Sequence, residues 1–310
     1  MRYAISSDLV DVLRPLVSVE LVPVGPDGAI SAPADAVQVG NNVTPAVLSR
    51  LLRQYQSIRW LSAPSAGVDP YLVPELARRA IQLTRPRRIH DAPVSEFALM
   101  LILAAAKRLP ELVRARDRAE WFRYDPPLLE GQTLLIVGYG EIGQALAARA
   151  KPLGLRIIGL RRHPEPDDLA DHVLPAEQLH DALEQADFAV LTAPGGPSNK
   201  HLIAEPELER LEPSAYLINV GRGDLVDADA LDRALREERF AGAFLDTFAV
   251  EPLPPDSPLW SNPRVMVTPH AAGVHAPARD PRVLAQIAEN IRRFSAGEPL
   301  LNTVDLERGY

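Results

Sequence analysis

Short apolar runs alternate with segments of helical period along the first ninety residues of the chain. The apolar runs are Tyr3 to Ile5, Val17 to Val22, Ala36 to Val39, Ile58 to Leu61 and Ile81 to Leu83. Residues 44–53 carry apolar side chains at the spacing of an amphipathic helix. Because strands that alternate with helices form parallel sheets covered on both faces, this pattern predicts an α/β domain.

A second alternating series follows a long helix predicted from Ala92 to Arg116, with Pro93 and Glu96 where helices usually start. The strand-like runs of this series are Thr133 to Val137, Leu155 to Leu160, Phe188 to Leu191, Tyr216 to Val220, Ala241 to Leu245 and Val265 to Thr268. Helices such as 227–237 separate several of them. Six parallel strands with crossover helices predict a doubly wound dinucleotide-binding fold. The tail, 281–296, has helical spacing and no strand of its own, so we expect it to pack on an earlier domain.

A glycine-rich turn follows the first strand of the second series. The run 134–137 leads into Gly138, Gly140 and Gly143, and then into the alanine-rich helix 144–151. In a dinucleotide site the first glycine permits the tight turn, the second lets the backbone approach a pyrophosphate, and the third lets helix and strand pack closely. The order of strand, glycine motif and helix predicts such a site, and a purely structural glycine turn is the alternative.

Two arginines stand where an NAD site usually has an acidic residue. The second strand of the series ends in LeuArgArgHis at 160–163. A carboxylate there would hold a ribose 2′-hydroxyl and repel a 2′-phosphate, whereas Arg161 and Arg162 can pair with the phosphate through forked hydrogen bonds. The sequence therefore favours NADPH over NADH. The alternative is a pair of solvated arginines on a surface turn.

Three polar residues follow the later strands and have the properties that a carbonyl reduction needs. Arg222 lies in a GlyArgGly loop, Glu251 follows the next strand, and His270 follows the last one. A histidine exchanges protons near neutral pH and suits a proton donor, and a neighbouring carboxylate stabilises its charged form and orients it. An arginine binds a carboxylate in a bidentate manner and polarises an adjacent carbonyl. Singly each residue also fits a structural role; together they predict reduction of a 2-oxo acid.

Further motifs extend this pattern over nearly the whole chain. They are SerAlaGlyValAsp from residue 65, ValGlyTyrGlyGluIleGly from 137, AsnValGlyArgGly from 219, AspThrPhe from 246, GluProLeuPro from 251, AspSerProLeuTrp from 256 and ThrProHisAlaAla from 268. With them the sequence resembles the D-isomer-specific 2-hydroxyacid dehydrogenases. Within that family it is most similar to the glyoxylate/hydroxypyruvate reductase branch that prefers NADPH, down to the closing ArgGlyTyr at 308–310.

The resemblance implies roles for individual residues. Arg222, Glu251 and His270 match the family's catalytic arginine, glutamate and histidine, with His270 as the proton donor. Asp246 matches the aspartate that contacts the nicotinamide carboxamide. The other implied cofactor contacts are Gly138, Tyr139, Gly140, Glu141, Ile142, Gly143, Thr192, Ala193, Pro194 and Val220. The implied substrate contacts are Arg222, His270, Ala66 and Gly67, the last two through backbone amides that hold the substrate carboxylate.

The resemblance also implies the architecture and the assembly. A Rossmann cofactor domain, 92–275, is expected as an insertion in a smaller, flavodoxin-like substrate domain formed by 1–91 and 276–310. Both domains are expected to be doubly wound parallel sheets. A homodimer through the cofactor domain and its first long helix is expected.

Several segments depart from the family pattern and leave the substrate open. Thr247 stands where many members have valine, and 195–199 replaces a more threonine-rich stretch; neither is expected to touch the chemistry. Residues 40–43 and the ArgProArgArg run at 85–88 do not follow the reductase branch. The run at 85–88 fits a solvated or interface cluster, or recognition of an acidic substrate group. His275 and Arg279 could reach the substrate or belong to polar surface.

Composition excludes several classes of protein. A length of 310 residues favours two domains, and the absence of cysteine excludes a disulfide scaffold, a thiolate metal site and a cysteine nucleophile. The histidines show no metal-ligand spacing, so no metal is predicted. A net charge of -8 argues against a nucleic-acid partner. The longest apolar run, Phe97 to Ala106, is shorter than the about 20 residues of a membrane span, and Asp8 and Asp11 lie where a signal peptide would be apolar, which predicts a cytoplasmic protein.

Two other functions remain open on the same scaffold. Transcriptional corepressors that bind dinucleotides resemble this family and keep the same three catalytic residue types. Phosphoglycerate dehydrogenases share the fold, but they often carry a regulatory domain for which 310 residues leave no room.

Overall fold

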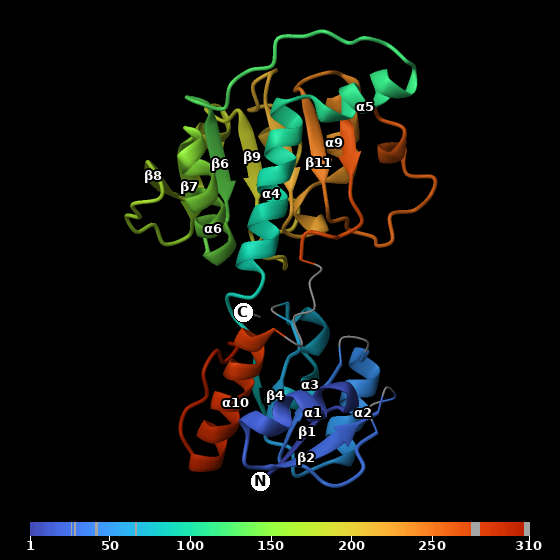
Figure 1. The fold of residues 1–310 in the computed structure, drawn as a ribbon, viewed down its shortest axis with the longest axis vertical. Coiled ribbons are helices and arrows are strands. Elements are labelled where there is room, and N and C mark those ends of the chain that lie inside the picture. Colours follow the sequence, from blue (N-terminus) through green and yellow to red (C-terminus); the bar gives the residue numbers. More distant parts are fainter. Residues whose placement is uncertain (26, 28, 41–42, 66, 274–279, 307–310) are drawn as a thin grey trace. The chain divides into compact units, whose positions relative to one another are not determined.

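Two parallel sheets form the framework of the computed structural model, which describes residues 1–25, 27, 29–40, 43–65, 67–273 and 280–306. The chain divides into one unit of Met1–Ile89 with His275–Tyr310 and a second unit of His90–Val274, and each unit contains one of the sheets (Figure 1). The predicted fold class, with one α/β domain inserted in another, is confirmed.

The smaller unit contains a sheet with the strand order of flavodoxin. Its strands, within the described residues, are β1 (Arg2–Ser6), β2 (Glu20–Val24), β3 (Ala36–Gln38), β4 (Trp60–Ser62) and β5 (Gln82–Thr84). All neighbours are parallel, in the order β2-β1-β3-β4-β5. The second strand was expected to begin at Val17, but Val17 and Val19 are still in the connection that precedes β2. They are apolar because they pack against the cluster that covers β1.

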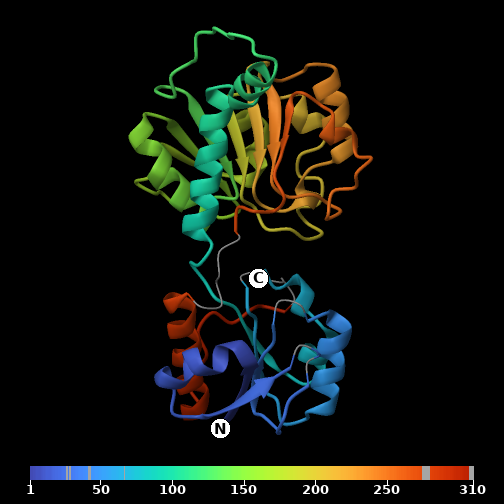
Figure 2. The same cartoon turned by 45° about the vertical axis from the view of Figure 1, so that its right-hand side comes forward.

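Helices cover both faces of this sheet. On one face, Ala4 and Leu61 pack against α2 (Pro45–Gln54) and α3 (Pro74–Arg78). On the other face, Trp60 packs against α1 (Val10–Leu13) and the C-terminal helix α10 (Pro281–Ala296), where its ring centroid lies 5.6 Å from that of Phe294. Figures 1 and 2 show α10, in red, beside the blue N-terminal elements. The tail helix therefore completes the N-terminal unit, as expected.

The larger unit contains a parallel sheet with the strand order of a Rossmann fold. Its described strands are β6 (Thr133–Val137), β7 (Arg156–Arg161), β8 (His172–Pro175), β9 (Phe188–Leu191), β10 (Tyr216–Asn219), β11 (Gly242–Leu245) and β12 (Val265–Val267). They lie in the order β8-β7-β6-β9-β10-β11-β12. The direction of winding reverses between β6 and β9, and ligands of such sheets bind at the carboxyl ends of the strands near this point.

The sequence pattern did not predict one strand of the larger sheet, nor a break in its first long helix. β8 has the sequence HisValLeuPro, so it lacks the longer apolar run that predicted the other six strands. The helix expected over 92–116 is two helices, α4 (Asp91–Ala106) and α5 (Leu109–Asp117). Pro110 has no amide hydrogen, and its ring would clash with the Ala106 carbonyl in a continuous helix. The chain turns at Arg108, whose φ is 49°.

Strand residues of the larger sheet alternate between two helical layers. Leu134 and Ile136 of β6 pack with α4 and α6 (Glu141–Ala150), and Leu135 and Val137 face the opposite layer. That layer comprises α7 (Leu179–Leu183), α8 (Glu205–Leu208) and α9 (Ala228–Arg236). Figure 1 shows α4 and α6 in front of the sheet and α9 behind it. Burial on both faces fixes the strands and therefore the loops at their ends.

Within the described residues, no helix is both long enough and apolar enough to cross a membrane.

The packing of α10 on the smaller unit can be tested by Ile287→Ala. Ile287 is 5% exposed, so the substitution is expected to cost about 2 to 5 kcal/mol and to lower the denaturant midpoint of that unit. The measurement uses a background with Trp121→Phe and Trp260→Phe, so that the red shift of tryptophan emission reports on the buried Trp60 alone. Leu16→Ala, at a position 52% exposed, is the control and should leave the midpoint in place. An unchanged midpoint for Ile287→Ala would contradict the packing.

Candidate active site

The glycine-rich turn after β6 contacts the loop after β9. These are the two strands between which the winding of the sheet reverses. Gly138 has a φ of +99°, and a side chain on it would overlap the backbone nitrogen of Ala193. The Thr192 hydroxyl donates a hydrogen bond to the Gly138 carbonyl at 2.9 Å. Only glycine therefore lets the loop after β6 lie against the loop after β9. The predicted residues Gly138, Thr192 and Ala193 meet at one place, and Pro194 continues this loop with its side chain exposed.

The other two glycines place the start of α6. A side chain on Gly143 would lie 2.9 Å from Cγ2 of Ile136, so its absence lets α6 pack on β6. At Gly140, the residue before α6, the nearest atom to such a side chain would be 3.9 Å away. The space beside Gly140 is therefore open. The first amides of α6, those of Glu141 and Ile142, lie next to it, as a pyrophosphate site requires.

Tyr139, between the first two glycines, points into the protein. Its side chain is 1% exposed, and its ring lies where a side chain on Gly159 of β7 would be. Burial raises the pKa of the Tyr139 hydroxyl above its ordinary value. Any contact that Tyr139 makes with a cofactor must therefore come from its backbone.

The two arginines predicted to select the cofactor lie at the carboxyl end of β7. Arg161 is the last residue of that strand, and Arg162 is exposed. Arg162 donates from Nη2 to the Ser198 hydroxyl at 2.8 Å and to Oδ1 of Asn199 at 3.2 Å. The Asn199 side chain in turn donates to the Pro194 carbonyl at 2.8 Å. The segment 195–199 was expected to be remote from the proposed chemistry, yet it contacts one of these arginines.

Arg222 is carried by a loop whose backbone is fixed by a buried side chain. Asn219, which is 1% exposed, donates from Nδ2 to the Arg222 carbonyl at 2.9 Å and accepts from the Gly221 amide at 3.0 Å. A side chain on Gly223 would overlap the Phe248 carbonyl group. The loops after β10 and β11 therefore lie in direct backbone contact. Val220, another predicted cofactor contact, is 6% exposed in the same loop.

Glu251 and His270 form a hydrogen-bonded pair. Oε2 of Glu251 lies 2.7 Å from Nδ1 of His270, and Oε1 accepts from the Phe248 amide at 2.9 Å. The His270 side chain is 48% exposed. With Nδ1 donating to the carboxylate, Nε2 is the ring nitrogen that can exchange a proton with a ligand. The structure thus brings together the predicted acid and its predicted partner, next to the loop that carries Arg222.

Asp246 is buried behind this pair, with an exposed fraction of 0%. Its carboxylate accepts hydrogen bonds from the Thr268 hydroxyl and from the amides of Ala271 and Ala272. Sequence reasoning did not single out Asn219 or Thr268. Each is a polar residue at the carboxyl end of a strand, and that position was the signal that could have identified them.

The remaining predicted residues belong to the smaller unit or lie outside the described residues. Gly67 follows β4, and its carbonyl accepts from the Ser65 hydroxyl at 2.9 Å. The backbone of the 85–88 run is attached to α10, because Gln286 exchanges two hydrogen bonds with Arg87 and Arg282 donates to the Arg88 carbonyl. Ala66, His275, Arg279 and 308–310 lie outside the described residues. Among the residues that are described, no three histidine or acidic side chains form a metal-binding group.

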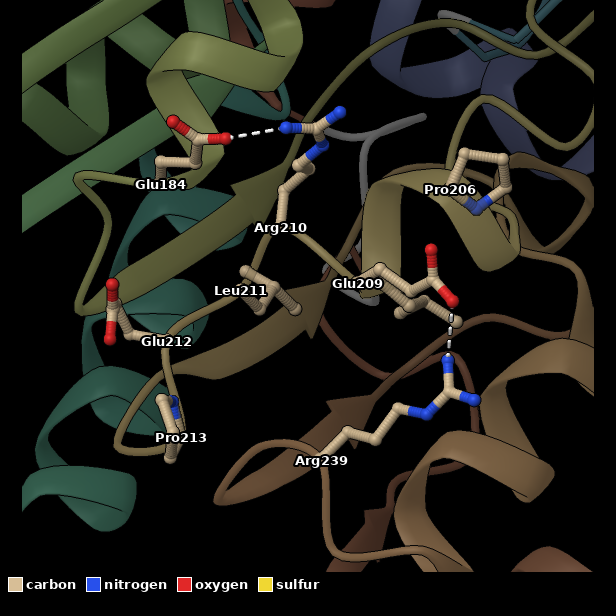
Figure 3. Close-up of a pocket in the computed structure, with 9 residues that line it drawn as sticks. Glu184, Pro206, Glu209, Arg210, Leu211, Glu212, Pro213 and Arg239 are labelled. Atoms are coloured by element: carbon tan, nitrogen blue, oxygen red, sulfur yellow. Dashed lines mark hydrogen bonds and ion pairs between the residues drawn. The ribbon is translucent and has the colours of Figure 1, made fainter.

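An open groove of about 710 Å³ lies at the other edge of the larger sheet (Figure 3). Its lining residues precede β9, β10 and β11 in the chain, whereas Arg222, Glu251 and His270 follow strands. Arg210 pairs with Glu184 at 2.7 Å, and Arg239 pairs with Glu209 at 3.1 Å (Figure 3). These paired charges lie far from the carboxyl ends where ligands of such sheets bind, so the candidate site is the one around His270.

Comparisons with known proteins identify the family of the chain. Residues 99–272 match the model of the D-isomer specific 2-hydroxyacid dehydrogenase, NAD binding domain. The chain is 36% identical to a glyoxylate reductase of Korarchaeum cryptofilum over 259 residues, which cover 81% of this chain and 77% of the relative.

Solved structures agree over the whole length of the chain. A D-isomer specific 2-hydroxyacid dehydrogenase from Xanthobacter autotrophicus Py2, in complex with NADPH and MES, matches with a TM-score of 0.89 and 28% identity, over 100% of this chain and 99% of that one. A family member from Aeromonas salmonicida matches with a TM-score of 0.84 and 28% identity, over 98% and 99% of the two chains. The chain therefore belongs to the D-isomer-specific 2-hydroxyacid dehydrogenase family, and its larger unit is the NAD(P)-binding domain of an oxidoreductase.

Proposed function

We propose that the protein reduces a small 2-oxo acid, such as glyoxylate or hydroxypyruvate, to the D-2-hydroxy acid, with NADPH as the preferred cofactor. The observation that carries this proposal is the hydrogen bond of 2.7 Å between Glu251 and His270, on loops that contact the loop of Arg222. The relative named glyoxylate reductase supports the choice of substrate.

In the proposed reaction His270 donates the proton and Arg222 binds the substrate. Arg222 pairs with the substrate carboxylate and polarises the adjacent carbonyl. The substrate contacts of Ala66 and Gly67 stay a prediction from the family resemblance. NADPH, when bound, supplies the hydride that adds to the carbonyl carbon. Nε2 of His270 gives its proton to the carbonyl oxygen, so the ring becomes neutral and the product is a hydroxyl. Glu251 accepts the hydrogen bond from Nδ1, which orients the ring and favours its charged form before each transfer.

The larger unit offers a fitting cradle for the cofactor. The amides at the start of α6 would hold the pyrophosphate, and the open position at Gly140 leaves room for it. The loop 192–194 would lie beneath the adenosine. Arg161 and Arg162 would pair with the 2′-phosphate, which supports NADPH over NADH, and a family structure in complex with NADPH agrees with this choice.

We also propose a homodimer through α4, α5 and the segment that follows them. Large apolar side chains of this surface are in contact with solvent: Met100, Leu103, Leu109, Val113, Trp121, Phe122 and Leu128. Trp121 is 89% exposed and Leu128 is 71% exposed. Exposed large apolar side chains that gather in one stretch of the chain favour an interaction site, because their burial is favourable by about 25 cal/mol per Å². The cytoplasmic location expected from the sequence stays a prediction.

The role of His270 is tested by His270→Ala. The substitution removes the proton donor, so kcat with hydroxypyruvate and NADPH should fall by about 10² to 10⁴-fold. The Kd of NADPH, measured by fluorescence titration, should change by no more than about twofold, because no predicted cofactor contact is removed. His172→Ala, on the exposed edge strand β8, is the control and should turn over like the wild type. Turnover of His270→Ala close to the wild type would refute the assignment.

The cofactor preference is tested by replacing Arg161 with glycine and Arg162 with aspartate together. Loss of the charged hydrogen bonds should lower the ratio of kcat/KM for NADPH to that for NADH by about tenfold or more. Arg239→Gly combined with Arg210→Asp, in the groove at the opposite edge of the sheet, changes the net charge by the same amount and should not move the ratio. A ratio that stays constant in the double variant would mean that the two arginines are ordinary surface residues.

The dimer is tested by placing charges on the exposed apolar surface. Trp121→Glu combined with Leu128→Glu should convert a particle of twice the chain mass into one of a single chain mass, as measured by sedimentation. Leu16→Glu, on an exposed apolar residue of the smaller unit, is the control and should leave the mass unchanged. A wild-type chain that sediments as a monomer would exclude the proposed assembly.

A further inference from the structure

The carboxylate of Asp246 is engaged by the segment that carries His270. The Thr268 hydroxyl donates to Oδ1 of Asp246 at 2.6 Å, the Ala271 amide donates to the same oxygen at 2.9 Å, and the Ala272 amide donates to Oδ2 at 2.9 Å. The donors lie on both sides of His270 in the chain. The side chain is 0% exposed, so these bonds are shielded from water.

The backbone of Asp246 holds the same segment. Its carbonyl accepts from the His270 amide at 2.8 Å, and the Thr268 amide bonds to the Leu245 carbonyl at 2.9 Å. Asp246 is itself tied to β10 through its amide, which donates to the Asn219 carbonyl at 2.9 Å. One residue at the end of β11 thus links the Arg222 loop to the His270 segment.

His270 needs such support because its backbone is strained. Its φ is 52°, in the left-handed region that residues other than glycine rarely adopt. Strained residues persist only where the surrounding bonds determine their conformation, and here the bonds to Thr268, Ala271 and Ala272 do so. An isolated histidine in this loop would relax, and Nδ1 would leave Glu251.

We propose that Asp246 is a positioning residue, which holds His270 in the left-handed conformation that brings its Nδ1 to Glu251. The proposal rests on the proposed role of His270 as the proton donor. It differs from the role that the family resemblance implies, a contact with the nicotinamide carboxamide. A cofactor contact predicts that loss of the carboxylate weakens NADPH binding, whereas a positioning role predicts that it lowers kcat and leaves NADPH binding in place.

The chain offers a matched set of variants for this test. Thr268→Val removes the hydroxyl that bonds to Asp246 and keeps the shape of the side chain. Thr268→Ser keeps the hydroxyl and serves as the conservative rescue. Thr247→Val is the control, because Thr247 is a buried neighbour whose hydroxyl has no hydrogen-bond partner within the described part of the chain. Asp246→Asn replaces a carboxylate oxygen with an amide NH2 group, which cannot accept a hydrogen bond.

Kinetics with NADPH and hydroxypyruvate give the first readout. We expect kcat to fall by about tenfold in Thr268→Val and by about a hundredfold in Asp246→Asn, since one and then several charged hydrogen bonds are lost. Thr268→Ser should restore most of kcat, and Thr247→Val should match the wild type. The Kd of NADPH should stay within about twofold throughout. An unchanged kcat in Thr268→Val and Asp246→Asn, or a loss confined to the Kd of NADPH, would overturn the proposal.

Nuclear magnetic resonance of the His270 ring nitrogens gives a second readout that needs no turnover. The ring shifts should differ from those of the wild type in Thr268→Val and Asp246→Asn, and should be retained in Thr268→Ser. Shifts that do not move in Asp246→Asn would overturn the positioning role, even if the wild type reduces no 2-oxo acid. Absence of turnover in the wild type would instead count against the proposed function alone.

Discussion

The hydrogen bond between Glu251 and His270 depends on three loops that meet at the carboxyl edge of the larger sheet. Gly223 has no side chain, so the loop after β10 touches the backbone at Phe248. The Phe248 amide holds one oxygen of Glu251, and the other oxygen lies 2.7 Å from His270. The pair therefore depends on the relative positions of three loops, which the parallel strands β10, β11 and β12 bring to the same edge of the sheet.

The same edge supplies the cofactor side of the site. At the point where the winding of the sheet reverses, Gly138 lets the turn after β6 lie against the loop after β9. The start of α6 is set by Gly143, which lets the helix approach Ile136. The glycine-rich turn and the proposed acid therefore depend on the same feature, the parallel order of the strands, which brings the loops that follow them to one edge of the sheet.

The sequence predicted those parts of the fold and of the site that depend on neighbouring residues in the chain. The LeuLeuIleVal run at 134–137 and the glycines after it identify β6 and its turn, because burial on both faces demands apolar residues and close packing demands glycine. The pairing of Glu251 with His270 followed from the chemistry that a carbonyl reduction needs. β8 was not predicted because its apolar run is too short, and the break at Arg108 was not predicted because the apolar spacing continues across it.

The sequence did not predict the contacts between segments that are far apart in the chain. The sequence did not show that the ring of Tyr139 lies against Gly159 of β7, so that a cofactor contact of Tyr139 stays a prediction for its backbone alone. The roles of Asn219 and Thr268 were not predicted. A polar residue at the end of a strand gives the same sequence pattern whether its side chain faces solvent or a buried loop. The hydrogen bonds of Arg162 with Ser198 and Asn199 likewise join segments that only the folded sheet brings together.

The most direct test of the account is the near-ultraviolet absorbance of NADPH in the presence of the wild-type protein and a panel of small 2-oxo acids. The account predicts oxidation of NADPH with glyoxylate or hydroxypyruvate, with the D-enantiomer as the product of the latter. Tight binding of NADPH without oxidation by any member of the panel would contradict it and would favour a dinucleotide-sensing protein instead.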